Sequence, residues 1–127
     1  MRISILFFFM ILSIGLISCS DSDSTSPEDK TYDVEYRVTG SANVSEIRYL
    51  THTGDTLTAL NINSGWSYKW ANKGKSGDQT YLRVLLVNTS GMAHLQILAN
   101  NSVLLADSIE GYANAVVSLG RGTTLPY

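Results

Sequence analysis

Apolar and polar residues alternate along most of the chain after residue 31. The alternation is clearest over residues 32–39, where every second residue is a tyrosine or a valine and the residues between them are charged or polar. A period of two in β-branched and aromatic residues is typical of a β-strand with one buried face. We therefore expect a strand over residues 32–39 that ends at Gly40 and buries Tyr32, Val34, Tyr36 and Val38.

Similar segments recur at intervals of about 8 to 12 residues, with Gly, Asn, Ser and Asp between them. The sequence Thr53-Gly54-Asp55 predicts a turn that joins its two flanking segments as a hairpin. Residues 72–78 are polar and contain two glycines, which indicates a long loop. The further strands that the pattern predicts are 44–51, 56–62, 66–70, 80–87, 92–99, 102–108 and 112–119.

One of these segments differs from the others. Residues 80–87 are apolar on both faces apart from Arg83, which is the pattern of a central strand covered on both sides. No segment after the N-terminal apolar run has the 3.6-residue period of a helix. Seven or eight short strands with turns between them predict an antiparallel β-sandwich, immunoglobulin-like in its general build.

The N-terminus has the layout of a secretory signal peptide. Arg2 is the only charge ahead of the apolar residues 3–17, and the small Ser18 precedes Cys19. The apolar run is shorter than the roughly 18 to 20 residues of a membrane-spanning helix. Leu16-Ile17-Ser18-Cys19 also resembles the lipobox of bacterial lipoproteins, which implies cleavage before Cys19 and attachment of lipid to it. The alternative is an ordinary signal peptide with an incidental cysteine.

The predicted organisation has three parts: a signal peptide over 1–18, a lipidated Cys19 with a flexible tether over 19–31, and a β-sandwich domain over 32–127. The tether is expected because residues 20–31 are rich in Ser and Asp and contain no large apolar residue that could offset the entropy of ordering. Lipid of more than one acyl chain would give stable attachment to a membrane.

Charge and cysteine content exclude several classes of function. Removing residues 1–18 leaves 8 of the 9 basic residues and all 11 acidic ones, a net charge of about −3. Nucleic-acid binding normally leaves a basic surface, so we expect no nucleic-acid partner. Because Cys19 is the only cysteine, the folded part has no disulfide, thiolate nucleophile or cysteine metal site.

Several short motifs together resemble a known family. Tyr36-Arg-Val-Thr-Gly-Ser-Ala42, Ile47-Arg-Tyr49, the strand at Trp66, and Ser76-Gly-Asp78 leading into Tyr81-Leu82 are similar to small bacterial envelope lipoproteins related to the periplasmic domain of the mycobacterial MmpS proteins. The resemblance implies a β-sandwich outside the cytoplasm and a role as an accessory to lipid-exporting transporters. This chain departs from the MmpS proteins because it has a lipobox in place of their transmembrane helix and lacks the cysteine pair of their domain.

The residues that carry catalysis or bind metals form no recognisable site. Gly74-Lys75-Ser76 lacks the earlier glycine and the following helix of a phosphate-binding loop, since Lys69 stands where that glycine is needed. His52 and His94 lie on different segments without clustered partner ligands, and alternation places His94 toward water. No Gly-x-Ser-x-Gly motif is present. We therefore expect no enzyme activity, no metal and no cofactor.

Trp66, Tyr68 and Trp70 project from the same side of one predicted strand. Spacing of about 6.6 to 7 Å between alternate residues suits stacking on successive sugar rings. Large aromatic residues on one strand face are, however, also typical of a sandwich core, and they could lie partly exposed at its rim. All three interpretations are open from the sequence.

These observations predict a lipid-anchored, non-catalytic lipoprotein of the cell envelope, in the outer membrane, facing either the periplasm or the outside. Its sandwich would bind or support another envelope component, such as a transport complex. The alternative is a carbohydrate-binding module that uses Trp66, Tyr68 and Trp70. The expected partners are the membrane, through lipid on Cys19, and an envelope protein or a glycan.

Overall fold

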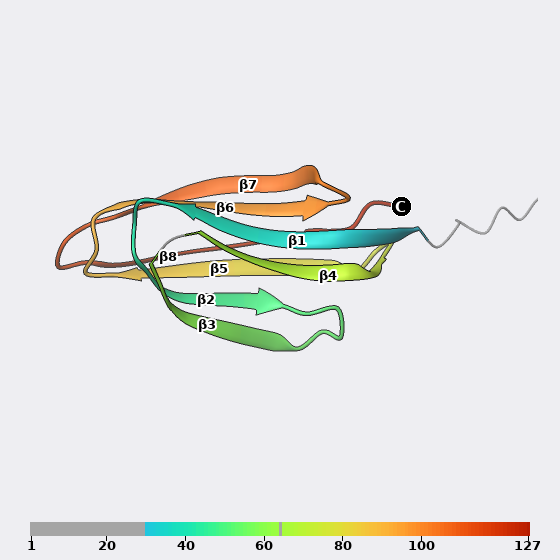
Figure 1. Ribbon diagram of the computed structural model, residues 1–127, viewed down its shortest axis with the longest axis horizontal. Coiled ribbons are helices and arrows are strands. Elements are labelled where there is room, and N and C mark those ends of the chain that lie inside the picture. The colour runs from blue at the N-terminus through green and yellow to red at the C-terminus, as the bar shows by residue number, and fades with distance from the viewer. Residues whose placement is uncertain (1–29, 64) are drawn as a thin grey trace, which may run out of the picture.

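The computed structural model describes residues 30–63 and 65–127, which form eight strands and no helix (Figure 1). The predicted signal peptide, Cys19 and most of the predicted tether lie outside the described residues. The strands are β1 (Thr31–Gly40), β2 (Val44–Leu50), β3 (Thr56–Ile62), β4 (Trp66–Lys75), β5 (Gln79–Val87), β6 (Gly91–Ala99), β7 (Ser102–Gly111) and β8 (Val116–Thr124).

The strands form two antiparallel sheets that pack as a sandwich, so the predicted fold class is confirmed. One sheet has the order β4-β1-β6-β7 and the other β3-β2-β5-β8. Two hairpins stay within a sheet, β2–β3 and β6–β7, and the remaining connections cross between the sheets. The predicted turn at residues 53–55 is confirmed, because the Thr51 amide donates to the Asp55 carbonyl at 2.8 Å and closes the β2–β3 hairpin.

The core lies between the two sheets and contains the apolar positions of each alternation. On β1 and β6 the inward residues are almost fully buried, and β5 contributes a matching row from the opposite sheet. Burying such a side chain stabilises the fold by about 1.5–3 kcal/mol. The fully buried aliphatic side chains of this core are Val34, Ile47, Leu82, Val84, Leu86, Leu95, Ile97 and Leu125.

The predicted loop over residues 72–78 is wrong in its first half, because β4 continues to Lys75. Gly74 pairs with Tyr32 and Lys75 with Thr31, at the start of β1. The pairing is irregular, with a register shift in β1 between Tyr32 and Val34, and Asn72 has a φ of 50°. Such a bulge lets polar residues continue along an edge strand, which periodicity does not reveal.

The last strand lies further along the chain than predicted. Residues 112–115 form a turn, in which Asn114 has a φ of 60° and the Ala115 amide donates to the Tyr112 carbonyl at 3.2 Å. Strand β8 then pairs with β5 along its whole length, from Val116 opposite Val87 to Thr124 opposite Gln79. Gly120 and Gly122 lie in β8, and because glycine has a low β-propensity, the sequence did not indicate a strand there.

The expectation that the strand at residues 80–87 is covered on both faces is also wrong. The inward residues of β5 are buried, but Tyr81 and Val87 on the outer face are 38% and 42% exposed. The sandwich has two layers, so nothing in the described chain covers this face. Tyr81 instead lies over β8, where a Cβ added to Gly120 would approach the Tyr81 Oη within 2.6 Å.

No helix among residues 30–63 and 65–127 has the length and apolar character needed to cross a membrane.

Candidate functional site

The three aromatic side chains of β4 point into the sandwich. Trp70 is 2% exposed and meets the Tyr36 ring edge to face, with centroids 5.9 Å apart. Its indole Nε1 donates to the Leu50 carbonyl at 3.1 Å, which joins β4 in one sheet to the end of β2 in the other. Trp70 therefore belongs to the core, and its polar atom has a buried partner.

Trp66 and Tyr68 are half-buried and pack on the same neighbour. The Tyr49 ring of β2 lies 4.8 Å from Trp66 and 4.6 Å from Tyr68 between centroids. Tyr49 is itself 8% exposed and also contacts Tyr36 at 6.2 Å. These rings form one aromatic cluster between the sheets, with its outer members near the edge formed by β3 and β4.

This arrangement bears on the sugar-stacking interpretation. A flat glycan platform requires rings that face solvent in a row, whereas here Trp70 is buried and the rings of Trp66 and Tyr68 pack against Tyr49. The alternation correctly placed the three side chains on one side of the strand. Only the packing of the two sheets showed that this side faces inward.

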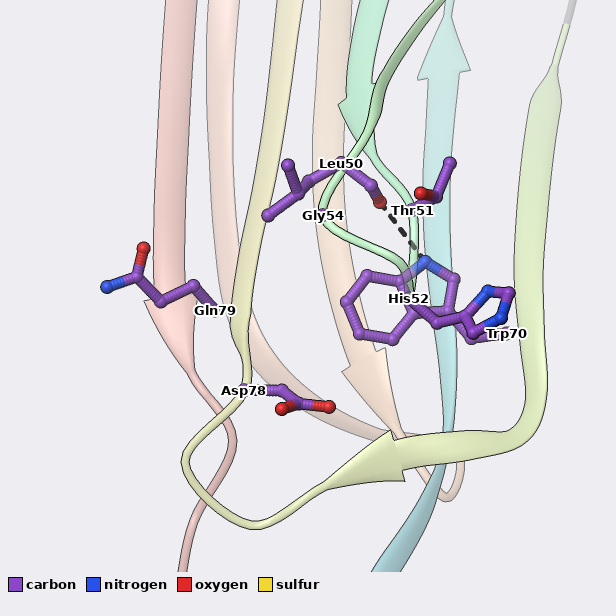
Figure 2. A pocket seen from close by; sticks show the side chains of 7 residues that line it. All are labelled: Leu50, Thr51, His52, Gly54, Trp70, Asp78 and Gln79. Carbon is purple, nitrogen blue, oxygen red and sulfur yellow. Dashed lines mark hydrogen bonds between the residues drawn. The ribbon is translucent and has the colours of Figure 1, made fainter.

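An open hollow of about 320 Å³ lies at the end of the sandwich where the β2–β3 and β4–β5 turns meet (Figure 2). Figure 2 shows the Trp70 indole next to the Leu50 carbonyl that accepts its hydrogen bond, with His52 overlapping it in this view and Asp78 to the lower left. The residues that line it are Leu50, Thr51, His52, Gly54, Trp70, Asp78 and Gln79.

The polar groups of this rim are mostly engaged with their own turns. The Asp78 Oδ2 accepts a hydrogen bond from the Lys75 amide at 2.9 Å. The hydroxyls of Thr51 and Thr53 lie 2.8 Å apart, and Thr53 donates to Asp55 at 2.7 Å. Because Trp70 is only 2% exposed, it offers almost no apolar surface to a bound partner.

The structure brings together one pair that the sequence did not place. The His94 Nδ1 lies 2.7 Å from the Ser108 Oγ on the outer face of the β4-β1-β6-β7 sheet. A regular two-residue hairpin at Asn100-Asn101 would have set His94 opposite Asp107. A bulge in the pairing between Ile97 and Leu98 shifts the register by one residue, so His94 lies opposite Ser108. The hairpin turn could have predicted that His94 lies near residues 107 and 108. The bulge that sets it opposite Ser108 could not be predicted.

A serine next to a histidine supplies two of the three groups of a catalytic triad, but no third group orients this histidine among the described residues. A catalytic histidine is held by a third group, usually a carboxylate. The neighbouring Asp107 instead accepts hydrogen bonds from the Ser108 amide at 2.8 Å and from the Arg121 side chain at 2.6 Å. His94 and Ser108 are exposed on a sheet face, as alternation predicted for His94. The contact is best described as a cross-strand pair.

The other predicted site residues lie apart from one another. His52 is exposed in the β2–β3 turn, and Gly74-Lys75-Ser76 joins the end of β4 to its turn. Within residues 30–63 and 65–127, no group of three or more His, Cys, Asp or Glu side chains is placed to hold a metal ion. Cys19 lies outside the described residues.

Comparison with known proteins gives no relative: no protein-family model, no curated protein and no solved structure matches this chain.

Proposed function

We propose that this chain is a lipid-anchored, non-catalytic component of the bacterial outer membrane whose sandwich binds or supports another envelope component. The observation that carries the proposal is the order of three features along the sequence. A lipobox-like tetrad ends in Cys19, a segment without large apolar residues follows, and strand β1 begins at Thr31. This is the order expected of a domain held near a membrane by lipid at its first residue.

The position of β1 indicates which end of the domain would carry the anchor. Strand β1 begins beside the C-terminus, where the Tyr32 Oη donates to the Pro126 carbonyl at 3.1 Å (Figure 1). The Ser76 amide donates to the Lys30 carbonyl at 3.2 Å, so the β4–β5 turn and the hollow beside it are at the same end. An anchor at Cys19 would place the hollow at the anchored end of the domain. The partner contacting it would then also be close to the membrane.

The resemblance to the MmpS domain favours a transport accessory as the role of such a component. The lipobox and the missing cysteine pair are departures from that family. The proposed partner is therefore a component of the envelope, and the resemblance favours a lipid exporter.

The anchoring step is tested by labelling cells with a radioactive or clickable fatty acid. Wild-type chain should incorporate label and sediment with membranes, and Cys19→Ala should do neither. Ser20→Ala, one residue further on, is the matched control and should label like wild type. Absence of label from the wild type, or label that persists in Cys19→Ala, would overturn the proposal.

Glycan binding is tested separately on a panel of immobilised envelope polysaccharides. We expect no retention, because the rings of β4 pack against Tyr49 and Tyr36. Retention that disappears in a folded Trp66→Ala variant would instead favour the carbohydrate-binding alternative.

A further inference from the structure

Four of the eight strands that the structure describes lie at sheet edges, and they differ in how they are protected. The edges are β4 and β7 in one sheet and β3 and β8 in the other. An edge strand presents unpaired backbone N–H and C=O groups and can pair with another chain. Natural proteins commonly block this pairing with charged residues, bulges or a covering element.

Three of the edges carry such protection. Strand β4 contains three lysines and an irregular pairing with β1. Strand β7 contains Asp107 and Glu110 and has a bulge in its pairing with β6. Strand β8 contains Arg121 and lies against β7, where Arg121 contacts Asp107 at 2.6 Å.

Strand β3 carries none of these features. Its sequence, TLTALNI, contains no charged residue and no proline. Leu57 is 43% exposed and Leu60 is 62% exposed. Leu57 lies opposite the buried Tyr49, so it faces the inner side of its sheet, yet 43% of its surface remains exposed. The β3 edge therefore combines free backbone groups with exposed apolar side chains.

We propose that β3 pairs antiparallel with β3 of a second copy of this chain, with the two-fold axis between the two Thr58 residues. The β3-β2-β5-β8 sheets of the two copies then become one continuous sheet across the dimer. The uncharged sequence favours a second copy as the occupant, because an edge that pairs with itself places identical residues close together. On β4, β7 or β8 such pairing would bring like charges together, which is destabilising.

The register follows from the residues of the strand. Asn61 has a φ of 55°, which turns the end of β3 out of regular pairing and leaves Thr56–Leu60 as the regular part. Centring these five residues on Thr58 sets Thr58 opposite Thr58 of the second copy, Leu57 opposite Ala59, and Thr56 opposite Leu60. Threonine pairs are favourable across antiparallel strands. Leu57 on the inner face and Leu60 on the outer face then each gain a cross-strand neighbour from the other copy.

The dimer is compatible with anchoring of both copies in one membrane. Antiparallel pairing puts the two β1 starts at opposite ends of the dimer, and a ten-residue strand is about 33 Å long. Residues 20–30 span at most about 35–40 Å when extended. The two domains would therefore lie side by side along the membrane surface. Confinement to the membrane would also raise their effective concentration. This arrangement on the membrane depends on the proposed anchoring, whereas the pairing of β3 does not.

Cysteine cross-linking of the full chain in cell membranes tests the register. Directly opposed residues in an antiparallel pair have Cα atoms about 4.5–5.5 Å apart, within the range of a disulfide. Thr58→Cys should therefore form a disulfide-linked dimer on mild oxidation. Ser67→Cys, an exposed small residue on the β4 edge, is the matched control and should stay monomeric. The wild type, which contains Cys19 alone, shows any dimer formed through that residue.

Charge pairs at the same position test the interface without a cross-link. Chains carrying Thr58→Lys, or chains carrying Thr58→Glu, should each lose self-association several-fold in co-purification of two differently tagged copies. Co-expression of the lysine and glutamate variants should restore it. This recovery also shows that the variants are folded.

The outcomes separate this inference from the proposed function. Cross-linking at residue 58 that does not exceed that at residue 67, or self-association that is unchanged in both charge variants, would overturn the β3 dimer. A disulfide from residue 58 to a different protein would likewise reject a second copy as the occupant. If Cys19 carries no lipid and the Thr58→Cys dimer still forms, the anchoring fails and the dimer stands.

Discussion

The two long sides of this sandwich differ in how closely the edge strands of the two sheets approach each other. On one side β7 and β8 lie against each other, and half-buried aliphatic residues fill the space between the sheets: Leu105 and Ile109 from β7, and Val117 and Leu119 from β8. On the other side β3 and β4 make no comparable contact within the described chain. There the wider gap is filled by the aromatic cluster of Tyr49, Trp66, Tyr68 and Trp70.

The difference shows how one core supports both a closed side and an open one. Aliphatic side chains are sufficient where the sheets approach closely, whereas large rings are needed where they diverge, because each ring buries 150 Å² or more. The rings stabilise the open side without covering the edge of β3. That edge is consequently the part of the domain that is most available for a partner.

The largest effect is expected from truncation of the open side at Trp70. Trp70→Ala should lower the free energy of unfolding by about 3–5 kcal/mol, because it leaves a cavity and an unpaired Leu50 carbonyl. Urea denaturation measures the change. Trp66→Ala, in which a half-exposed ring is removed from the same strand, should cost clearly less. Equal losses in the two variants would contradict the placement of Trp70 at the centre of the core.

An intermediate effect is expected from truncation of the closed side. Leu119→Ala on β8 removes a half-buried side chain, so it should cost about 1–2 kcal/mol, below the usual range for fully buried leucine. The same denaturation measurement applies. A loss as large as that of Trp70→Ala would show that the closed side contributes as much to stability as the aromatic side.

A smaller effect is expected at Tyr36, which contacts Trp70 and Tyr49 of the aromatic side. Its hydroxyl accepts a hydrogen bond from the Tyr81 amide at 3.3 Å, so Tyr36→Phe should cost about 1 kcal/mol at neutral pH. Burial raises the pKa of Tyr36 above its ordinary value. The folded state therefore keeps the phenol proton that the unfolded state releases above about pH 10.

The consequence is a loss of stability at alkaline pH. The contribution of Tyr36 is fully present below the ordinary tyrosine pKa and is lost as pH rises toward the raised one. Burial also raises the pKa of Tyr49, so both residues contribute in the same direction. Tyr36→Phe should therefore flatten the decline of stability above pH 10. If stability declines as steeply in Tyr36→Phe as in the wild type, the alkaline loss of stability comes from titratable groups other than Tyr36.

The smallest effect is expected from the ion pair of the closed side. Hydrogen bonds from the Ser108 amide and from Arg121 lower the pKa of Asp107. Its contribution is present above the ordinary aspartate pKa and is lost as pH falls toward the lowered one. Arg121→Gln should reduce this acid dependence and leave stability near neutral pH almost unchanged, because exposed ion pairs contribute little. NMR titration of the Asp107 carboxyl measures the change, and an unaltered pKa would contradict the contact.

The composition of the aromatic face was predictable from the sequence, but its burial was not. The sequence indicated that Trp66, Tyr68 and Trp70 share one face, because side-chain direction alternates along any strand. It did not indicate that Tyr49, seventeen residues before Trp66, would cover that face, since this depends on how the sheets pack. The hollow and the His94–Ser108 pair likewise depend on turns and on a bulge that shifts register by one residue.

The amino-acid sequence by itself determined the β-sandwich class, the positions of most strands and the β2–β3 hairpin, because period-two alternation and turn residues are local properties of the chain. The extension of β4 to Lys75 and the displacement of β8 to Val116–Thr124 were decided by pairing with strands distant in sequence. The tertiary structure alone decided which side of the sandwich is closed and which edge is free. Those properties are set by the order of strands in each sheet, where residues far apart in the chain become neighbours.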